Sequence, residues 1–387
     1  MRNFEYYCPT RLVFGEGRIA KLPDLIPSGC RSLMIVFGGG SVRKNGVYEQ
    51  VKAAIGNIPH TEFWGIEPNP CVETIRRAVE QGKRASVDFV LAVGGGSVID
   101  ATKLIVAALC TDMDAWEIVL SKKAEQTKPF GTVLTVPATG SEMNSGAVIS
   151  RADTKEKFAF SSAHPVFSIL DPKVTYSLSS HQVACGLADA FVHVIEQYLT
   201  LCGESRVMDR FAEGVLSTVI EIAPSLVKRH DDYDLMCDYM VSATAALNGM
   251  IAWGVTQDWA THMIGHEITA LSGLTHGASL VIVLPAMMRV LREQKRQKLL
   301  QYAERVWNLH VGTEDERIDR AIELTEDFFC SLGLPTRLED AGIGREIEDE
   351  VVRRFRDRSV SFGEGRNVDA DCCRVIFDCC RSSRAKK

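Results

Sequence analysis

The sequence lacks any stretch of about 20 predominantly apolar residues, the length needed to cross the hydrocarbon core of a bilayer. Its longest run without Asp, Glu, Lys or Arg covers residues 268–288, and polar residues, a glycine and a proline interrupt that run. The first seven residues include Glu5 and hold no apolar core, so we expect no secretory signal. We therefore expect no membrane association and a cytoplasmic protein.

An excess of basic residues is also absent. Lys and Arg number 44 against 50 Asp and Glu, which gives a net charge of −6. Nucleic-acid-binding proteins usually carry a basic surface, so we expect no nucleic-acid partner. The 12 cysteines are scattered along the chain, which favours reduced thiols over a disulfide framework. Four of them fit no usual zinc spacing and are interpreted as thiols on a terminal helix: Cys372, Cys373, Cys379 and Cys380.

The first half of the chain alternates between two patterns. Residues 32–37, 88–93 and 131–136 are short, mostly apolar runs, and each is followed by glycine or proline. Such runs are typical of buried parallel strands. Amphipathic segments at 47–55 and 72–83 lie between them. Because parallel strands need crossover connections, this alternation predicts an α/β domain with a parallel sheet.

The pattern changes near residue 178, after which strand-like runs vanish. Helical periodicity predicts six segments, at residues 184–201, 207–228, 233–252, 259–271, 280–308 and 314–331. The polar stretch within residues 175–185 is the expected boundary. We thus predict an α/β domain over residues 1–180 and an all-helical domain over residues 181–387.

A glycine loop follows the second predicted strand and opens a helix. Gly94, Gly95, Gly96 and Ser97 form this loop. Glycines let a backbone approach a phosphate closely, and a helix N-terminus offers free N–H groups. The loop therefore predicts a site for the diphosphate of a dinucleotide. A tight strand-to-helix connection without a ligand is the alternative.

A second glycine loop follows the first predicted strand. In dinucleotide-binding folds an acidic residue near this region contacts the ribose, whereas a basic residue accommodates a 2′-phosphate. No acid occurs between Phe37 and Gly46, and Arg43 is one of three donors there. This composition favours NADP(H), and a solvated loop is the alternative. The residues expected to contact the cofactor are Gly38, Gly39, Gly40, Ser41 and Lys44.

The helical half carries a cluster of metal-ligating residue types. Asp189 and His193 stand four residues apart, which places them on one face of a helix. His262 and His266 have the same spacing, and His276 follows ten residues later. This pattern predicts ligands for a metal ion. Histidines that cap helices or make ordinary hydrogen bonds are the alternative.

One metal ion can join His262 and His276 only if the helix breaks between them. Fourteen residues of unbroken helix span about 21 Å, whereas two ligand atoms of one ion lie within about 4–5 Å of each other. Gly273 supplies a stop, and Ser272 and Thr275 are turn or cap candidates. One Asp with three His suits Fe²⁺ or Zn²⁺ and leaves a coordination position for substrate.

The combination of these motifs resembles the iron-type, group III alcohol dehydrogenases. It is most similar to the NADPH-dependent butanol dehydrogenase and broad-specificity aldehyde reductase branch. The resemblance covers nearly the whole chain. Its motifs lie at residues 4–15, 94–103, 135–142, 186–196, 258–266 and 275–277.

The resemblance implies a dinucleotide-binding domain followed by a metal-binding domain. It also implies hydride transfer between NADP(H) and short-chain aldehydes or primary alcohols, with a divalent metal as Lewis acid. His266 is expected near the substrate, and a homodimer is expected to form through N-terminal strands. The implied metal ligands are Asp189, His193, His262 and His276. Further implied cofactor contacts are Asn69, Asp100, Thr135, Thr139 and Lys157.

One segment departs from the family pattern. Close relatives usually carry prolines and a basic residue where this chain has Ser179, Ser180 and His181. We expect this change to loosen a hinge between the domains or to alter a cofactor contact. Two rival functions are a metal-dependent cyclase or lyase of the dehydroquinate synthase type and a non-catalytic metal or nucleotide sensor. The first is disfavoured because few basic residues accompany the metal motifs.

Overall fold

The computed structural model describes residues 1–381, and the chain divides into two compact units. The sheet unit comprises Tyr7–Leu178 and His230–Asn248. The helical unit comprises Met1–Tyr6, Ser179–Arg229 and the chain from Gly249 onward. The expected division at residue 180 falls next to the boundary at Ser179. The expected division is wrong for helix α9 (Tyr233–Leu247), however. It places α9 in the helical domain, whereas α9 packs within the sheet unit.

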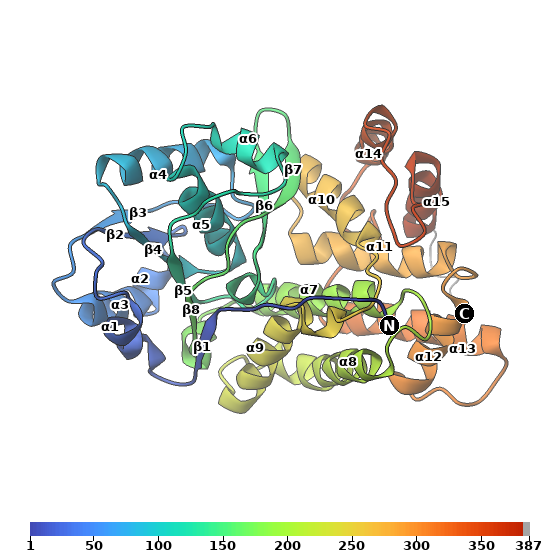
Figure 1. Cartoon of the computed structure of the whole chain (residues 1–387). Coiled ribbons are helices and arrows are strands. Elements are labelled where there is room, and N and C mark those ends of the chain that lie inside the picture. Colours follow the sequence, from blue (N-terminus) through green and yellow to red (C-terminus); the bar gives the residue numbers. More distant parts are fainter. Residues whose placement is uncertain (382–387) are drawn as a thin grey trace. The chain divides into compact units, whose positions relative to one another are not determined.

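The sheet unit is built on six parallel strands in the order β1-β8-β5-β4-β2-β3 (Figure 1). Strands β2, β4 and β5 confirm the three predicted ones, whereas β1, β3 and β8 have only four residues each and were not predicted. The bounds are β1 (Arg11–Phe14), β2 (Leu33–Phe37), β3 (His60–Phe63), β4 (Phe89–Gly94), β5 (Phe130–Leu134) and β8 (Phe167–Leu170).

Alternate residues of a strand face opposite sides of the sheet, and helices cover both sides. Met34 and Val36 pack in one apolar cluster with helices α4 (Val72–Arg84), α5 (Gly96–Ala108) and α6 (Ala115–Leu120). Leu33, Ile35 and Phe37 pack in another with helices α1 (Leu22–Leu25) and α3 (Val47–Ile55). The predicted α/β class is therefore confirmed as a doubly wound sheet. Helix α2 (Ser41–Lys44) precedes α3.

The strand order reverses at β2, because β3 pairs with one edge of β2 and β4 pairs with the other. In open α/β sheets, ligands bind outside the carboxyl ends of the strands at such a reversal. A separate antiparallel hairpin, β6 (Gly146–Arg151) and β7 (Glu156–Ser161), completes the strands of this unit. Its short helical turns are η1 (Arg18–Lys21), η2 (Ser141–Met143) and η3 (Pro172–Thr175).

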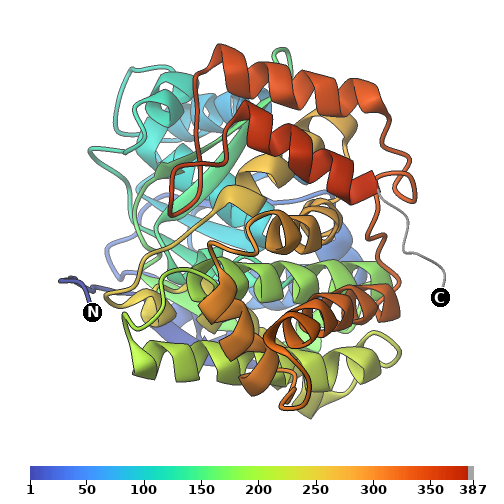
Figure 2. The same cartoon turned by 90° about the vertical axis from the view of Figure 1, so that its right-hand side faces the viewer.

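The helical unit is built around α7 (Ser180–Tyr198), whose residues from Val183 to Tyr198 are all buried. Helices α14 and α15 lie side by side against α10 and α11 (Figure 2). This confirms the predicted all-helical second half. No described helix is both long and apolar enough to cross a membrane. The bounds are α8 (Arg206–Leu226), η4 (Met250–Ala252), α10 (Ala260–Ser272), α11 (His276–Val290), α12 (Arg296–Arg305), α13 (Glu314–Ser331), α14 (Arg345–Asp357) and α15 (Ala370–Arg381).

Two predicted helices end earlier than expected. The single helix predicted over residues 280–308 is wrong, because α11 ends at Val290 and α12 begins at Arg296. Lys295, between them, is buried and donates to the Leu199 carbonyl and to Asp258. These tertiary contacts turn the chain where no glycine or proline marks a stop. The helix predicted over residues 233–252 likewise ends at Leu247.

Two segments singled out in the sequence have local structural roles. Ser179 is the N-cap of α7 and forms a capping box with Gln182, so the unusual serine begins a helix. The cysteines near the C-terminus lie on α15, as expected, and form no disulfide among the described residues. Cys373 and Cys380 are buried and Cys372 is partly buried.

Candidate functional site

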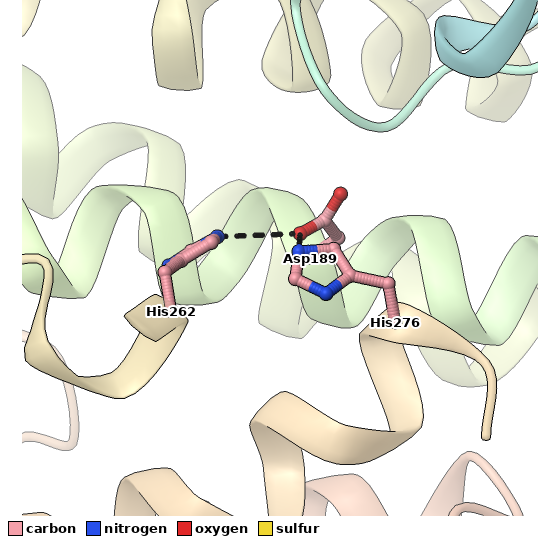
Figure 3. Close-up of side chains that lie close together, drawn as sticks. All are labelled: Asp189, His262 and His276. Atoms are coloured by element: carbon pink, nitrogen blue, oxygen red, sulfur yellow. Dashed lines mark ion pairs between the residues drawn. The ribbon is translucent and has the colours of Figure 1, made fainter. Parts of the chain in front are cut away.

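Three predicted metal ligands meet inside the helical unit. Asp189 lies on α7, His262 on α10 and His276 at the first residue of α11. One ligand atom from each of the three lies within 4.8 Å of the others. Figure 3 shows the two imidazole rings turned toward the carboxylate. Side chains from three helices thus converge on one point.

The spacing of these atoms fits an ion better than it fits hydrogen bonds. Oδ1 of Asp189 lies 3.6 Å from Nε2 of His262 and 3.7 Å from Nε2 of His276. Hydrogen bonds between nitrogen and oxygen are about 2.7–3.2 Å long. Two ligand atoms that each lie about 2.1 Å from a tetrahedral ion are about 3.4 Å apart. Nε2 of His262 is buried and has no hydrogen-bond partner among the described residues, as expected of a ring nitrogen that ligates a metal.

His193 and His266 lie beside this group. Nδ1 of His193 is buried, lacks a hydrogen-bond partner within the described chain and lies 3.7 Å from Oδ1 of Asp189. The His193 ring stacks on His262 with centroids 4.5 Å apart. The group of atoms within 4.8 Å does not include His193, so its part as a fourth ligand stays a prediction. His266 is buried one turn after His262, and its ring centroid is 5.0 Å from that of His276.

The surroundings shift the pKa values of two buried histidines in opposite directions. Burial lowers the pKa of His193 to about 4, although Asp189 opposes that change. Burial also disfavours the charged form of His262. There, however, the carboxylates of Glu196 and Asp189 outweigh burial and raise the pKa to about 9. The pair therefore holds one neutral and one protonated imidazole near pH 7 when no cation is bound.

The helix break predicted between His262 and His276 is confirmed. Helix α10 ends at Ser272, and Gly273 follows in the left-handed conformation with φ 77°. The Gly273 N–H donates to the Thr269 carbonyl over 2.9 Å, which closes the last turn. Helix α11 then begins at His276 and brings its imidazole back beside α7.

Two neighbours of the metal group were missed from the sequence. Glu196 on α7 accepts hydrogen bonds from the first turn of α10, including one from the His262 ring. Its spacing of seven residues from Asp189 and three from His193 places all three on one helix face and is a signal that could have identified it. Trp259 precedes α10 with φ 68°, which is rare for an aromatic residue, and its ring lies 5.5 Å from that of His262.

In the sheet unit, the first glycine loop joins β4 to α5. A Cβ on Gly96 would lie 2.4 Å from Oγ1 of Thr139, and one on Gly95 would lie 2.8 Å from Cβ of Val136. Tight packing alone therefore requires glycine at these two positions. Helix α5 begins here, at the carboxyl end of β4, without a side-chain cap, and such a helix N-terminus binds an anion favourably.

The second glycine loop joins β2 to α2 at the neighbouring strand end. A Cβ on Gly39 would meet no atom within 4 Å, and Gly40 adopts a positive φ of 103°. Ser41 and Lys44 are exposed on α2. Arg43 instead lies over the Trp64 ring, 3.9 Å from its centroid. The loop thus presents an open backbone with a hydroxyl and an ammonium group.

The remaining predicted cofactor residues fall into two linked groups. In the first group, Asn69 joins Ser97 to Lys157. Its N–H donates to Oγ of Ser97 over 3.3 Å, and its Oδ1 accepts from Nζ of Lys157 over 2.8 Å. Asp100 is tied instead to Ser141, whose hydroxyl donates to it over 2.6 Å. Thr135 follows β5, and its N–H donates to the Gly94 carbonyl over 3.0 Å.

A buried lysine organises the loop after β5. Nζ of Lys103 donates to Oγ of Ser141, Oδ1 of Asn144 and the Gly146 carbonyl over 2.6–3.0 Å. Burial lowers the pKa of Lys103 to about 8, against the attraction of Asp100. Burial raises the pKa of Asp100, although Lys103 opposes that change. This network anchors the segment that carries Thr139 to the helix that follows the first glycine loop.

Comparison with protein families matches both parts of the chain. Residues 9–172 match the model described as iron-containing alcohol dehydrogenase. Residues 183–371 match the model described as the C-terminal region of the Fe-containing alcohol dehydrogenase family.

Individual proteins and structures agree with this match. The chain is 49% identical to the NADPH-dependent aldehyde reductase YqhD of Escherichia coli strain K12, over 98% of this chain and 100% of that protein. It is 40% identical to the probable NADH-dependent butanol dehydrogenase 1 of Bacillus subtilis strain 168, over 96% and 97%. A crystal structure of E. coli YqhD has a TM-score of 0.96 at 48% identity, over 98% and 99%. A structure of the NADH-dependent butanol dehydrogenase A of Thermotoga maritima has a TM-score of 0.94 at 34% identity, over 99% of both chains.

Proposed function

Because this chain belongs to the iron-containing alcohol dehydrogenase family, we propose that it is a metal-dependent oxidoreductase that transfers hydride between NADP(H) and short-chain aldehydes or primary alcohols. One observation carries the proposal. Oδ1 of Asp189 lies 3.6–3.7 Å from ring nitrogens of three histidines, which come from its own helix and from two others. These separations exceed the length of ordinary hydrogen bonds and match those between ligand atoms that share one divalent cation.

The proposed metal ligands are Asp189, His193, His262 and His276, and Fe²⁺ or Zn²⁺ suits such a nitrogen-rich set. The side chain of His276 is 20% exposed, whereas those of Asp189 and His262 are 5% and 6% exposed. An aldehyde would therefore reach the centre from the side of His276. The side chains of Asp189 on α7 and His262 on α10 are buried and thus shielded from water.

The chemistry is divided between the cofactors and the chain. When bound, the metal supplies Lewis-acid polarisation of the carbonyl group and NADPH supplies the hydride. Asp189 and the histidines would hold the metal in place. His266 would provide the proton that the product oxygen takes up, since its ring centroid lies 5.0 Å from that of His276.

NADP(H) is the proposed nucleotide because of the loop after β2. That loop carries Ser41 and Lys44 and no acidic side chain, so it offers donors to a 2′-phosphate. The diphosphate would lie against residues 94–97, where β4 ends and α5 begins. Asn69, Asp100, Thr135, Thr139 and Lys157 would line the rest of the nucleotide site.

A homodimer is the proposed assembly, and the cytoplasm its proposed location. Strand β1 is an edge strand of the sheet, and within the described chain its only strand partner is β8. Leu12 on β1 is 43% exposed, and an open edge of this kind can pair with a second copy. Light scattering should therefore give twice the chain mass of 42.7 kDa. A Leu12→Lys variant should shift the protein toward monomer.

The proposed activity can be tested directly. Metal-free protein is refilled with Fe²⁺ or Zn²⁺, and oxidation of NADPH and of NADH is followed with butyraldehyde and with longer and shorter aldehydes. We expect metal-dependent turnover that is faster with NADPH. A sensor would bind the metal or the nucleotide without turnover, and a cyclase or lyase of the dehydroquinate synthase type would consume no NADPH with these aldehydes.

A further inference from the structure

Glu196 lies on the far side of His262 from the metal group. The Glu196 carboxylate is on α7, with a side chain 3% exposed, and it accepts a hydrogen bond from Nδ1 of His262 through Oε2. Nε2, the other ring nitrogen, lies 3.6 Å from Oδ1 of Asp189. The imidazole thus stands between two carboxylates of the same helix, with one nitrogen directed to each.

The other carboxylate oxygen of Glu196 accepts hydrogen bonds from the backbone of α10. Oε1 accepts from the N–H of Thr261 over 2.6 Å and from the N–H of His262 over 3.3 Å. Both N–H groups belong to the first turn of α10, where they have no acceptor within the helix and lie at the positive end of the helix dipole. A neighbouring backbone bond joins the same segments, because the Asp258 N–H donates to the Glu196 carbonyl over 2.9 Å.

We infer that Glu196 is a positioning residue that selects the ring tautomer of His262, protonated at Nδ1, and so directs the lone pair of Nε2 to the metal. An imidazole that ligates a metal through one nitrogen usually donates its other N–H to a carboxylate or carbonyl, and this partner sets the tautomer and the ring orientation. The inference rests on the metal centre of the proposed function, and it adds a residue that neither touches the ion nor meets the substrate.

Replacement of Glu196 by glutamine tests this inference, because both carboxylate oxygens of Glu196 accept hydrogen bonds. Glu196 uses both carboxylate oxygens as acceptors, whereas a glutamine side chain in its place would have one oxygen and one NH₂ group, which only donates. The backbone N–H groups of α10 would retain the oxygen, so the NH₂ group would face Nδ1 of His262. Nδ1 would then accept, and the proton would move to Nε2, where it opposes metal binding. Glu196→Gln should therefore weaken metal binding although its shape is nearly unchanged.

The experiment measures zinc affinity by competition with a chromophoric chelator, together with melting temperature and steady-state kinetics. We expect Glu196→Gln to bind Zn²⁺ roughly 10- to 100-fold more weakly than the natural protein, the range typical of lost outer partners. The kcat of Glu196→Gln, measured at saturating Zn²⁺, should fall by a smaller factor than its affinity for Zn²⁺. The matched control is Glu326→Gln, which alters a buried carboxylate held by Arg289 and Arg337. It should lower the melting temperature and leave zinc affinity unchanged.

A second measurement does not require a variant at position 196 to fold. Zinc-loaded natural protein, labelled with ¹⁵N only in histidine, should show the His262 ring protonated at Nδ1, with the signal assigned by its loss in His262→Asn. A proton on Nε2 would overturn the inference, as would natural zinc affinity in a folded Glu196→Gln protein. If the natural protein itself binds no Zn²⁺ or Fe²⁺, the proposed function fails instead, and the two failures are thereby distinguished.

Discussion

Nε2 of His276 lies 3.7 Å from Oδ1 of Asp189, although the two residues belong to different helices and His276 is only the first residue of its own. Helix α10 must end before Gly273 for this approach to occur. The left-handed glycine is thus a structural condition of the proposed metal centre, since it reverses the chain within a few residues.

Removal of His276 should abolish the metal centre. We expect His276→Ala to lose bound metal and to reduce kcat/KM for aldehyde by more than about 100-fold, because a direct ligand outweighs an outer partner. Metal content by atomic absorption and NADPH oxidation would measure both effects. His310→Ala, at an exposed histidine, should behave like the natural protein. Full turnover by a metal-free His276→Ala protein would refute the proposed mechanism.

Metal binding should release a proton at neutral pH. The pKa of His262 in the metal-free protein is raised to about 9, so its ring is protonated at pH 7. The pKa of His193 is lowered to about 4, so that ring is already neutral. A cation must displace the proton of His262, and its apparent affinity should therefore rise with pH until about pH 9. Titration calorimetry in buffers of different ionisation enthalpy measures the release, and a heat that is independent of the buffer would contradict it.

An acid in the loop after β2 should shift the nucleotide preference. A side chain on Gly39 would meet no atom within 4 Å, so Gly39→Asp should fold normally. Its carboxylate would repel a 2′-phosphate and could accept from ribose hydroxyls. We expect kcat/KM for NADPH to fall about tenfold or more relative to that for NADH, an effect of about 1.4 kcal/mol. Gly39→Asn has a similar shape without the charge and should change this ratio far less.

Lys103 should make stability depend on alkaline pH. Burial lowers its folded-state pKa from 10.5 to about 8, so the folded protein binds fewer protons than the unfolded chain between these values. The free energy of unfolding should therefore rise with pH from about 8 to 10.5, by about 3 kcal/mol from this group. Below pH 8, Lys103 adds no pH dependence to the free energy of unfolding. Denaturant titrations should find that Lys103→Met lacks this rise and that Lys83→Met, at an exposed lysine, retains it.

The glycine loops and the histidine spacings could be read in the sequence because they are local signals. Each of the three predicted strands was followed by glycine or proline, and the structure places them as β2, β4 and β5. The expected break between His262 and His276 depended on one glycine, and Gly273 adopts the conformation that makes it. In each case the information lies within a few residues of the feature.

Other features depend on residues far apart in the chain. Strand β1 is only four residues long and half exposed, and it is defined by its pairing with β8, so no local pattern identifies it. The end of α11 depends on Lys295, which binds Asp258 and the Leu199 carbonyl instead of continuing a helix. Helix α9 follows the pattern of the helical half yet packs in the sheet unit, where Thr244 donates to Glu142 over 2.6 Å.

The fold class, the loops suited to a dinucleotide and the residue types of a metal centre followed from the sequence alone, because periodicity, glycine and side-chain chemistry act over short distances. Which side chains meet depended on the packing of the whole fold. It joined Asp189 to His262 and His276, left His193 beside them, and placed Glu196 behind the His262 ring. The physical reason is that helix packing sets these distances, and packing depends on the whole buried core at once.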